Sequence, residues 1–325
     1  MSKIIVFPGP PDGETERERA KREQAEQRLE KLRELLERLE SRNAPAEGIR
    51  DTYEAAVALE KKHDLPRRAV FDYCLWLRDQ EDPDRAIPLT EEYIEYWKRT
   101  EDELRTANGY GLLGCLYDDM DRVDAAMENY LKAREIYERL AAGGDPAFRH
   151  TAASLSLSLG HLYKISERYD DAEREYLCAK ELFEGLASET SPSGGQDLVF
   201  SYRCLGELYL ATKDLVKAEW AFLRAKAIYA RLDRAAPGKR DDTLATVCID
   251  LGYLYGSTKR FPEAEREFLQ ARSLLAYQAE LGPRGDKSSL RTALVNLRTL
   301  YILTKEKEKL EEIRRQIARL EDRLS

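Results

Sequence analysis

The chain has 325 residues, of which 42% are hydrophobic and 35% are charged, and its formal net charge is −8 at pH 7. The apolar content suffices to bury a continuous core, and the charged fraction is typical of an elongated molecule with much surface. The negative charge argues against general affinity for nucleic acid or an anionic membrane, and no apolar stretch reaches the roughly 18 residues of a membrane-spanning helix.

Residues 1–45 are expected to form a flexible N-terminus followed by one charged helix with a leucine repeat. Acidic and basic residues alternate over residues 14–42, with apolar residues at helical spacing: Ala25, Leu29, Leu32, Leu36 and Leu39. One interpretation is a coiled-coil strand through which the chain self-associates. A helix laid over the open end of the following helices is favoured, because fewer than three or four heptads are present.

Residues 46–106 are expected to be a divergent helical region. An amphipathic helix is predicted over 46–63, and a degenerate helix pair over 66–107. Within that pair Cys74 and Ala86 have the same spacing as a glycine and an alanine that recur further along the chain.

Residues 107–305 contain a motif that returns every 46 residues. Gly114, Gly160, Gly206 and Gly252 are each followed three residues later by a tyrosine (Tyr117, Tyr163, Tyr209, Tyr255), and Tyr301 marks a fifth, partial copy. Regular spacing without insertions indicates stacked structural units. The units are placed at 107–152, 153–198, 199–244 and 245–290, with a last unit beginning at 291–305.

Each unit is predicted to be two antiparallel helices joined by a short turn. In the copy at 153–198 the first helix breaks at Ser166–Arg168 and the second begins near Asp170. Three further columns lie on the second helix: a first alanine (Ala126, Ala172, Ala218, Ala264), an aromatic (Tyr130, Tyr176, Phe222, Phe268) and a second alanine (Ala133, Ala179, Ala225, Ala271). Glycine and the first alanine are expected to face each other across the pair, with the tyrosine three residues after each glycine filling the remaining gap.

These columns resemble the tetratricopeptide repeat. That family's usual unit has about 34 residues, so the longer copies here are similar to the long-repeat subfamily of kinesin light chains and bacterial regulatory proteins. The resemblance implies an all-α fold, a right-handed α-solenoid of antiparallel helix pairs. Residues 306–325 are then the C-terminal capping helix, because a terminal repeat needs a polar outer face.

Catalytic and metal-binding motifs are not found. The sequence lacks a phosphate loop, a GxSxG elbow, an HExxH motif and Cys–His metal spacing. His63 is placed near a helix end and His150 in a loop, so neither is predicted to act as a base. We therefore expect no enzyme activity, no cofactor and no metal. Five scattered cysteines without a CxxC pair predict reduced thiols and a cytoplasmic location.

The resemblance implies that the first helix of each unit lines a concave groove in which a partner binds. The groove residues inferred from this placement are Asn108, Asp118, His161, Lys164, Phe200, Arg203, Glu207, Tyr253 and Thr299. Glycine- and proline-containing loops at 143–146, 191–195, 236–239 and 282–285 form a second, less favoured surface.

The predicted function is a non-catalytic adaptor or scaffold that binds a peptide or helix of another protein in this groove. Two alternatives stay open. The chain could be a regulator or sensor whose superhelix changes pitch on binding a ligand, or a scaffold that self-associates through residues 14–42. The identity of the partner is not encoded in any recognisable motif.

Overall fold

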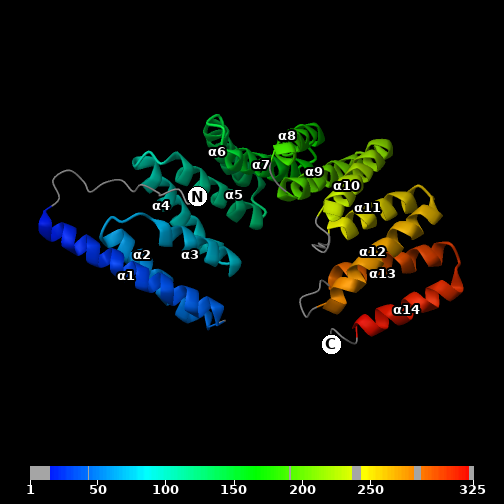
Figure 1. Cartoon of the computed structure of the whole chain (residues 1–325), viewed down its shortest axis with the longest axis horizontal. Helices are drawn as coiled ribbons and strands as arrows, with labels where there is room; N and C mark the ends of the chain where they lie inside the picture. The colour runs from blue at the N-terminus through cyan, green and yellow to red at the C-terminus, as the bar shows by residue number, and fades with distance from the viewer. Residues whose placement is uncertain (1–14, 43, 190–191, 236–242, 282–286, 322–325) are drawn as a thin grey trace. The chain divides into compact units, whose positions relative to one another are not determined.

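A computed structural model describes residues 15–42, 44–189, 192–235, 243–281 and 287–321, and these residues form fourteen α-helices and no strand (Figure 1). The chain divides into two compact units, Met1–Ile136 and Tyr137–Ser325, called here unit 1 and unit 2. The boundary falls inside helix α6 (Val123–Ala141). The first 46-residue copy therefore contributes to both units.

Unit 1 contains five complete helices and most of α6. The bounds of the five are α1 (Glu16–Ser41), α2 (Ala46–Lys62), α3 (Arg68–Asp79), α4 (Pro83–Arg99) and α5 (Glu103–Asp119). The helix predicted over 46–63 and the degenerate pair over 66–107 correspond to α2, α3 and α4. Cys74 and Ala86 are both fully buried, with the Cys74 sulfur 3.7 Å from the Ala86 carbonyl oxygen.

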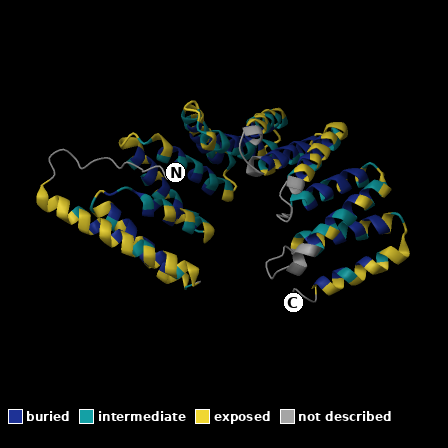
Figure 2. Ribbon diagram, viewed as in Figure 1, coloured by how far each residue is buried: buried dark blue, intermediate teal, exposed yellow. Residues whose placement is uncertain are grey.

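Helix α1 begins at a capping box, in which Thr15 and Glu18 satisfy each other's backbone N–H groups. Its apolar residues Ala25, Leu29 and Leu36 are buried in the core that it shares with α2 and α3. The opposite side of the helix is exposed along most of its length (Figure 2). The stripe that a coiled coil would use is therefore packed within the chain.

A buried carboxylate joins α2 to α3. Glu60 has no exposed surface, and its two oxygens accept hydrogen bonds from the backbone N–H groups of Ala69 (2.7 Å) and Val70 (3.2 Å). These N–H groups belong to the first turn of α3, where no intrahelical partner exists. Arg67 completes the junction by donating to the carbonyl oxygens of Glu60 and Leu65. Glu60 therefore acts as a long-range helix cap.

Unit 2 consists of four helix pairs in chain order. They are α7 (Pro146–Ile165) with α8 (Tyr169–Glu189), α9 (Pro192–Ala211) with α10 (Leu215–Ala235), α11 (Thr243–Ser257) with α12 (Phe261–Leu281), and α13 (Lys287–Leu303) with α14 (Lys307–Glu321). Each helix packs on the next one in the chain, and successive first helices also contact one another. The core is a continuous band of apolar side chains from Ala153 to Leu320.

Every turn inside a pair of unit 2 uses the same backbone geometry. The residue at its centre adopts a left-handed conformation with φ near +60°, although none is glycine: Glu167, Lys213, Lys259 and Lys305. The N–H of the following residue bonds to the carbonyl of the column tyrosine, as Arg260 does to Tyr255 at 2.8 Å. This closes the end of the first helix in a Schellman-type cap, and the expected break at Ser166–Arg168 is confirmed.

The glycine column is a point of close approach, but its partner differs from the one expected. A Cβ built on Gly206 would lie 2.5 Å from a ring carbon of Phe222. The same relationship holds for Gly114 with Tyr130, Gly160 with Tyr176, and Gly252 with Phe268. The aromatic column therefore fills the space beside each glycine. The expectation that the tyrosine three residues after each glycine fills this gap was wrong.

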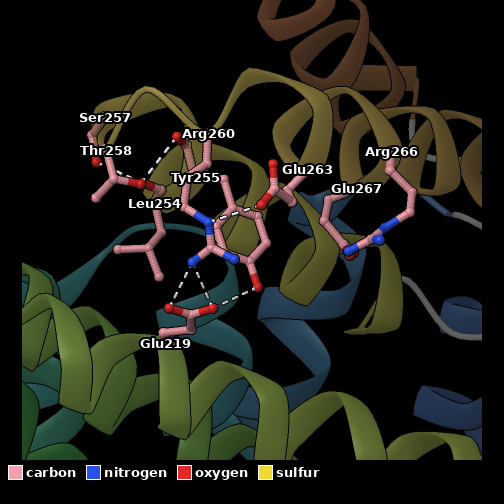
Figure 3. A network of polar contacts seen from close by, with 9 residues as sticks. All are labelled: Glu219, Leu254, Tyr255, Ser257, Thr258, Arg260, Glu263, Arg266 and Glu267. Carbon is pink, nitrogen blue, oxygen red and sulfur yellow. Dashed lines mark hydrogen bonds and ion pairs between the residues drawn. The ribbon is translucent and has the colours of Figure 1, made fainter.

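The tyrosine column instead links one pair to the next. The hydroxyl of Tyr255 donates to Glu219 of the preceding second helix at 3.0 Å, and Arg260 donates to the same carboxylate at 2.8 Å (Figure 3). The Arg260 guanidinium also lies 4.2 Å from the centre of the Tyr255 ring. Equivalent trios of tyrosine, glutamate and lysine recur at Tyr209, Glu173 and Lys217, and at Tyr301, Glu265 and Lys309. We call this arrangement the inter-pair clasp.

Two sequence expectations about loops need correction. His150 lies within α7 and not in a loop, and its Nε2 is 2.8 Å from Oδ2 of Asp197 on α9. Pro146 and Pro192 are the first residues of α7 and α9, because proline at a helix start lacks only an N–H that would be unpaired anyway. The loop segments expected at 236–239 and 282–285 lie outside the described residues.

A helix is present within the range 306–325 expected for the capping helix, as α14 (Lys307–Glu321), while residues 322–325 lie outside the described residues. Its residues Ile313, Ile317 and Leu320 are buried, while the remainder of the described helix is mostly exposed (Figure 2). One apolar stripe therefore packs on the solenoid and the charged faces meet water.

Candidate functional site

The first helices of unit 2 form one side of its helix layer. Helices α7, α9, α11 and α13 contact their successors directly, whereas contacts between successive second helices are sparse or absent in the described part of the chain. The side on which neighbouring helices approach more closely is the inner side of a stacked array. We call it the first-helix face, and seven of the nine predicted groove residues belong to its helices.

Three of those residues meet in one ion-pair network. Glu207 of α9 accepts from Lys164 of α7 at 2.9 Å and from Arg203, one turn earlier on α9, also at 2.9 Å. All three side chains are less than one third exposed, so solvent screens their attraction less than on an open surface. The predicted charged centre of the groove is therefore a connected structure that joins two helix pairs.

A fourth charged residue, Asp250 of α11, extends the network to a third pair. Burial raises the pKa of its carboxyl to about 7, although the positive charges of Arg203 and Lys164 act in the opposite direction. Its Oδ2 is buried, as is Nε of Arg203, and neither atom has a hydrogen-bond partner among the described residues. The network thus holds polar atoms that a small rearrangement could offer to a ligand.

Two aromatic side chains on this face are exposed. Tyr253 of α11 is 63% exposed and Phe200 of α9 is 43% exposed. The guanidinium of Arg203 lies 5.2 Å from the centre of the Phe200 ring, a cation–π contact that ties this ring to the charged network. Exposed aromatic residues beside a charged centre are typical of protein-binding surfaces.

The remaining predicted residues are placed as follows. His161 of α7 and Thr299 of α13 are exposed, and the Thr299 hydroxyl donates to the Val295 carbonyl of its own helix. Asn108 and Asp118 lie on α5 of unit 1, where Tyr130 donates to Asp118 at 3.4 Å. The structure thus brings together Lys164, Phe200, Arg203 and Glu207, while Asn108 and Asp118 belong to the other unit.

Sequence reasoning missed Asp250. The signal was present, because the equivalent positions in the other copies are uncharged: Leu112, Ser158, Cys204 and Asn296. A carboxylate in such a column is expensive to bury and is usually retained for a specific partner. The groove residues inferred from the sequence came only from the outward-facing positions of each first helix, which exclude this column.

Metal-binding and membrane-spanning features are absent from the residues that the structure describes. No cluster of three or more histidine, cysteine or acidic side chains suited to a metal ion occurs within those ranges. No described helix combines the length and apolar character needed to cross a membrane.

The model of the tetratricopeptide repeat family matches residues 107–139, which contain the first copy of the glycine, alanine and aromatic columns. Residues 107–139 are therefore a tetratricopeptide repeat, the first in an array of helix pairs with that fold. Its repeats are 46 residues apart, and the two helices of each repeat are the pairs described above. A search of curated proteins gives no match.

Solved structures with this fold include several tetratricopeptide arrays. BtubC (BKLC) from P. vanneervenii is 23% identical, with a TM-score of 0.53 over 83% of this chain and 95% of that one. The TPR-like repeats of a putative kinesin light chain from Podosopora anserina are 14% identical, with a TM-score of 0.53 over 66% and 96%. A signal transduction ATPase from Pyrococcus horikoshii with a tetratricopeptide repeat sensor is 16% identical, with a TM-score of 0.61 over 95% and 47%. At these identities the likeness establishes the fold alone.

Proposed function

We propose that this chain is a non-catalytic adaptor that binds a segment of another protein on the first-helix face of unit 2. The observation that carries the proposal is the shared carboxylate of Glu207, which ties Lys164 and Arg203 together beside exposed Phe200. Tetratricopeptide arrays present such a face as a long recognition surface. A partner segment with both charged and apolar side chains fits this arrangement. A cytoplasmic location agrees with the five cysteines, none of which forms a disulfide bond in the described residues.

The aromatic residues supply the sharper test, since reversing charges at Arg203 and Glu207 would also disturb Lys164. Phe200 and Tyr253 are exposed, so changing both to alanine should alter the free energy of unfolding by less than about 0.5 kcal/mol each. Each truncation should weaken partner binding about tenfold or more if these residues are binding hot spots.

The measurement is photocrosslinking in cells that express the chain. A photoreactive amino acid at position 253 should trap a partner segment, and Phe200→Ala in the same chain should reduce that product. The same probe at Glu181, exposed on second helix α8, is the matched control. Equal products at both positions, or no product at 253, would refute binding on the first-helix face.

A regulator whose helix pairs shift on binding is the second candidate. It is favoured by the partnerless atoms of Arg203 and Asp250, which allow the network to exchange partners between α9 and α11. X-ray scattering of the chain with and without the crosslinked segment tests it. A scattering profile that does not change on binding would contradict the regulator proposal and remain consistent with the adaptor proposal.

A further inference from the structure

A second surface of unit 2, on helix α10, carries apolar side chains that are exposed to solvent. Val216, Trp220, Leu223 and Ala227 of α10 are all exposed, with Val216 at 82% and Trp220 at 49%. Their spacing of four, three and four residues places them along one face of the helix over three turns. We call this set the α10 stripe. It lies on a second helix, apart from the first-helix face.

The other second helices show what these positions normally hold. Counting from the first alanine column, the equivalent residues are Asp124, Glu128, Leu131 and Glu135 on α6; Asp170, Arg174, Leu177 and Glu181 on α8; Pro262, Arg266, Leu269 and Ser273 on α12; and Glu308, Glu312, Arg315 and Arg319 on α14. Every one of these helices has at least one charged residue at the four positions. The stripe of α10 has none, so the repeat itself does not require an apolar face there.

A row of basic residues runs beside the stripe. Lys217, Arg224 and Arg231 are seven residues apart, which places all three along the same side of the apolar face. Their equivalents on α8 and α12 are acidic or uncharged: Asp171, Cys178, Gly185, Glu263, Gln270 and Tyr277. On α6 two of these positions are also basic (Lys132 and Arg139), and on α14 the first is Lys309, but neither helix has the apolar stripe. Among these second helices, the combination of an apolar stripe with a basic flank therefore occurs on α10 alone.

The conformation of the Trp220 side chain is restricted by a neighbouring aromatic ring. Its ring lies 5.6 Å from that of Tyr202, edge to face, and Tyr202 is almost fully buried. This contact restricts the tryptophan side chain before any partner arrives, which reduces the entropy lost on binding. Alanine at 227 and at 230, both exposed, leaves room for another backbone to approach the C-terminal part of the stripe.

We propose that the α10 stripe docks an amphipathic helix of another protein that carries acidic residues along one side of its apolar face. The apolar residues of that helix cover Val216 and Trp220, and its acidic side pairs with Arg224 and Arg231. Apolar residues at this spacing are the contacts that an amphipathic helix makes when it docks on a surface. The basic flank determines which way round the bound helix lies.

Two other occupants fit less well. An anionic membrane surface would also meet α8, whose equivalent face carries Asp170 and Glu181. A second copy of the chain in antiparallel pairing would place the basic flank against itself. A single acidic helix lying along α10 avoids both conflicts.

The test uses two synthetic helical peptides of about 15 residues with the same leucine stripe. One carries glutamate and the other lysine along one flank. Binding to the full chain is followed by calorimetry and by the fluorescence of Trp220, with Trp220→Phe as the spectroscopic reference. The glutamate peptide should bind at least tenfold more tightly than the lysine peptide. The double variant Arg224→Glu and Arg231→Glu should reverse that preference.

A substitution taken from the neighbouring repeat controls for folding. Val216→Asp with Trp220→Arg installs the α8 residues at the same positions, so helicity and the unfolding midpoint should be retained while peptide binding falls at least tenfold. The proposal is overturned if neither peptide binds, if both bind equally, or if the charge variant keeps the original preference. Sedimentation of the chain with phosphatidylserine vesicles, or dimerisation abolished by the same double substitution, would assign the stripe to a membrane or to self-association instead.

Discussion

The hydroxyl of Tyr255 lies 3.0 Å from Oε1 of Glu219, a residue 36 positions earlier on the preceding helix pair. The same separation joins Tyr209 to Glu173 and Tyr301 to Glu265. Burial, reinforced by Glu219, raises the pKa of Tyr255 to about 12. The tyrosine column therefore fixes the position of one helix pair on the next.

The first prediction concerns this clasp. Tyr255→Phe removes only the hydroxyl, and the lost hydrogen bond should lower the free energy of unfolding by about 1 kcal/mol. Tyr253→Phe, two residues earlier and largely exposed, is the control and should change it by less than about 0.5 kcal/mol. Urea denaturation measures both. A double-mutant cycle with Glu219→Gln should give a coupling of about 0.5–1.5 kcal/mol, and additive effects would show that the bond does not link the two pairs.

The second prediction separates two glycines one turn apart on α11. Gly252→Ala places a methyl group 2.5 Å from the ring of Phe268, whereas Gly256→Ala meets nothing within 4 Å. The first change should cost about 1–3 kcal/mol through overpacking. The second should stabilise the chain by up to about 1 kcal/mol, because alanine favours a helix over glycine. Thermal unfolding of the two variants measures whether their changes in stability have opposite signs. A gain in stability in both variants would contradict the close approach of Gly252 to Phe268.

The repeat period allowed most of the fold to be predicted. Spacing alone located the turn at Ser166–Arg168, and the columns identified the helix pairs, because each column has one structural task repeated in every copy. The side chain that fills the gap beside each glycine was mistaken, since sequence spacing does not show which of the two aromatic columns lies against it.

The inter-pair clasp was also missed. It depends on contacts 36 residues apart, which no local pattern indicates. Its basic member also changes place within the repeat. Lys217 and Lys309 each stand eight residues after the column tyrosine, whereas Arg260 stands five residues after it. The side chain that completes the clasp therefore does not form one column across the three copies.

The arrangement of the first-helix face was predicted less completely than the fold. Family resemblance placed Lys164, Arg203 and Glu207 on one face, and the structure joins them in one ion-pair network; their role in binding stays a prediction. Asp250 was overlooked because it lies in a column of mostly core-facing residues. The α10 stripe was overlooked because apolar residues on a second helix are normally taken as core. Only the three-dimensional packing distinguishes exposed Trp220 from its buried neighbour at position 221.

The third prediction concerns the buried cap between α2 and α3. Glu60→Ala leaves the N–H groups of Ala69 and Val70 without their acceptors in a buried position. The expected cost is about 2–4 kcal/mol, from two unsatisfied donors. Glu60→Gln keeps one acceptor oxygen and should cost less than the alanine change. Hydrogen exchange provides a local readout, because the amide of Ala69 should lose protection in the alanine variant. Unchanged protection there would mean that α3 does not need the cap.

The last prediction concerns the dependence of stability on pH. Burial raises the pKa of Asp250 to about 7 from an ordinary value of 3.8. The folded chain thus keeps this proton over a range in which the unfolded chain has released it. The free energy of unfolding should therefore fall as pH rises from about 4 to 7 and then level off. Burial raises the pKa of Glu60 to about 7 as well, so its contribution has the same sign.

Asp250→Asn isolates one part of that dependence. The amide cannot ionise, so the loss of stability between pH 5 and pH 8 should be about 1–2 kcal/mol smaller than in the parent chain. Some dependence should remain, because Glu60 is unchanged. Asp170→Asn removes the same formal charge from an exposed position of α8. In this variant the free energy of unfolding should change between pH 5 and pH 8 by as much as in the parent chain. Urea denaturation at both pH values gives the comparison. If Asp250→Asn and Asp170→Asn behave alike, the carboxyl of Asp250 releases its proton in the folded chain as readily as in water, and the network on the first-helix face is open to solvent.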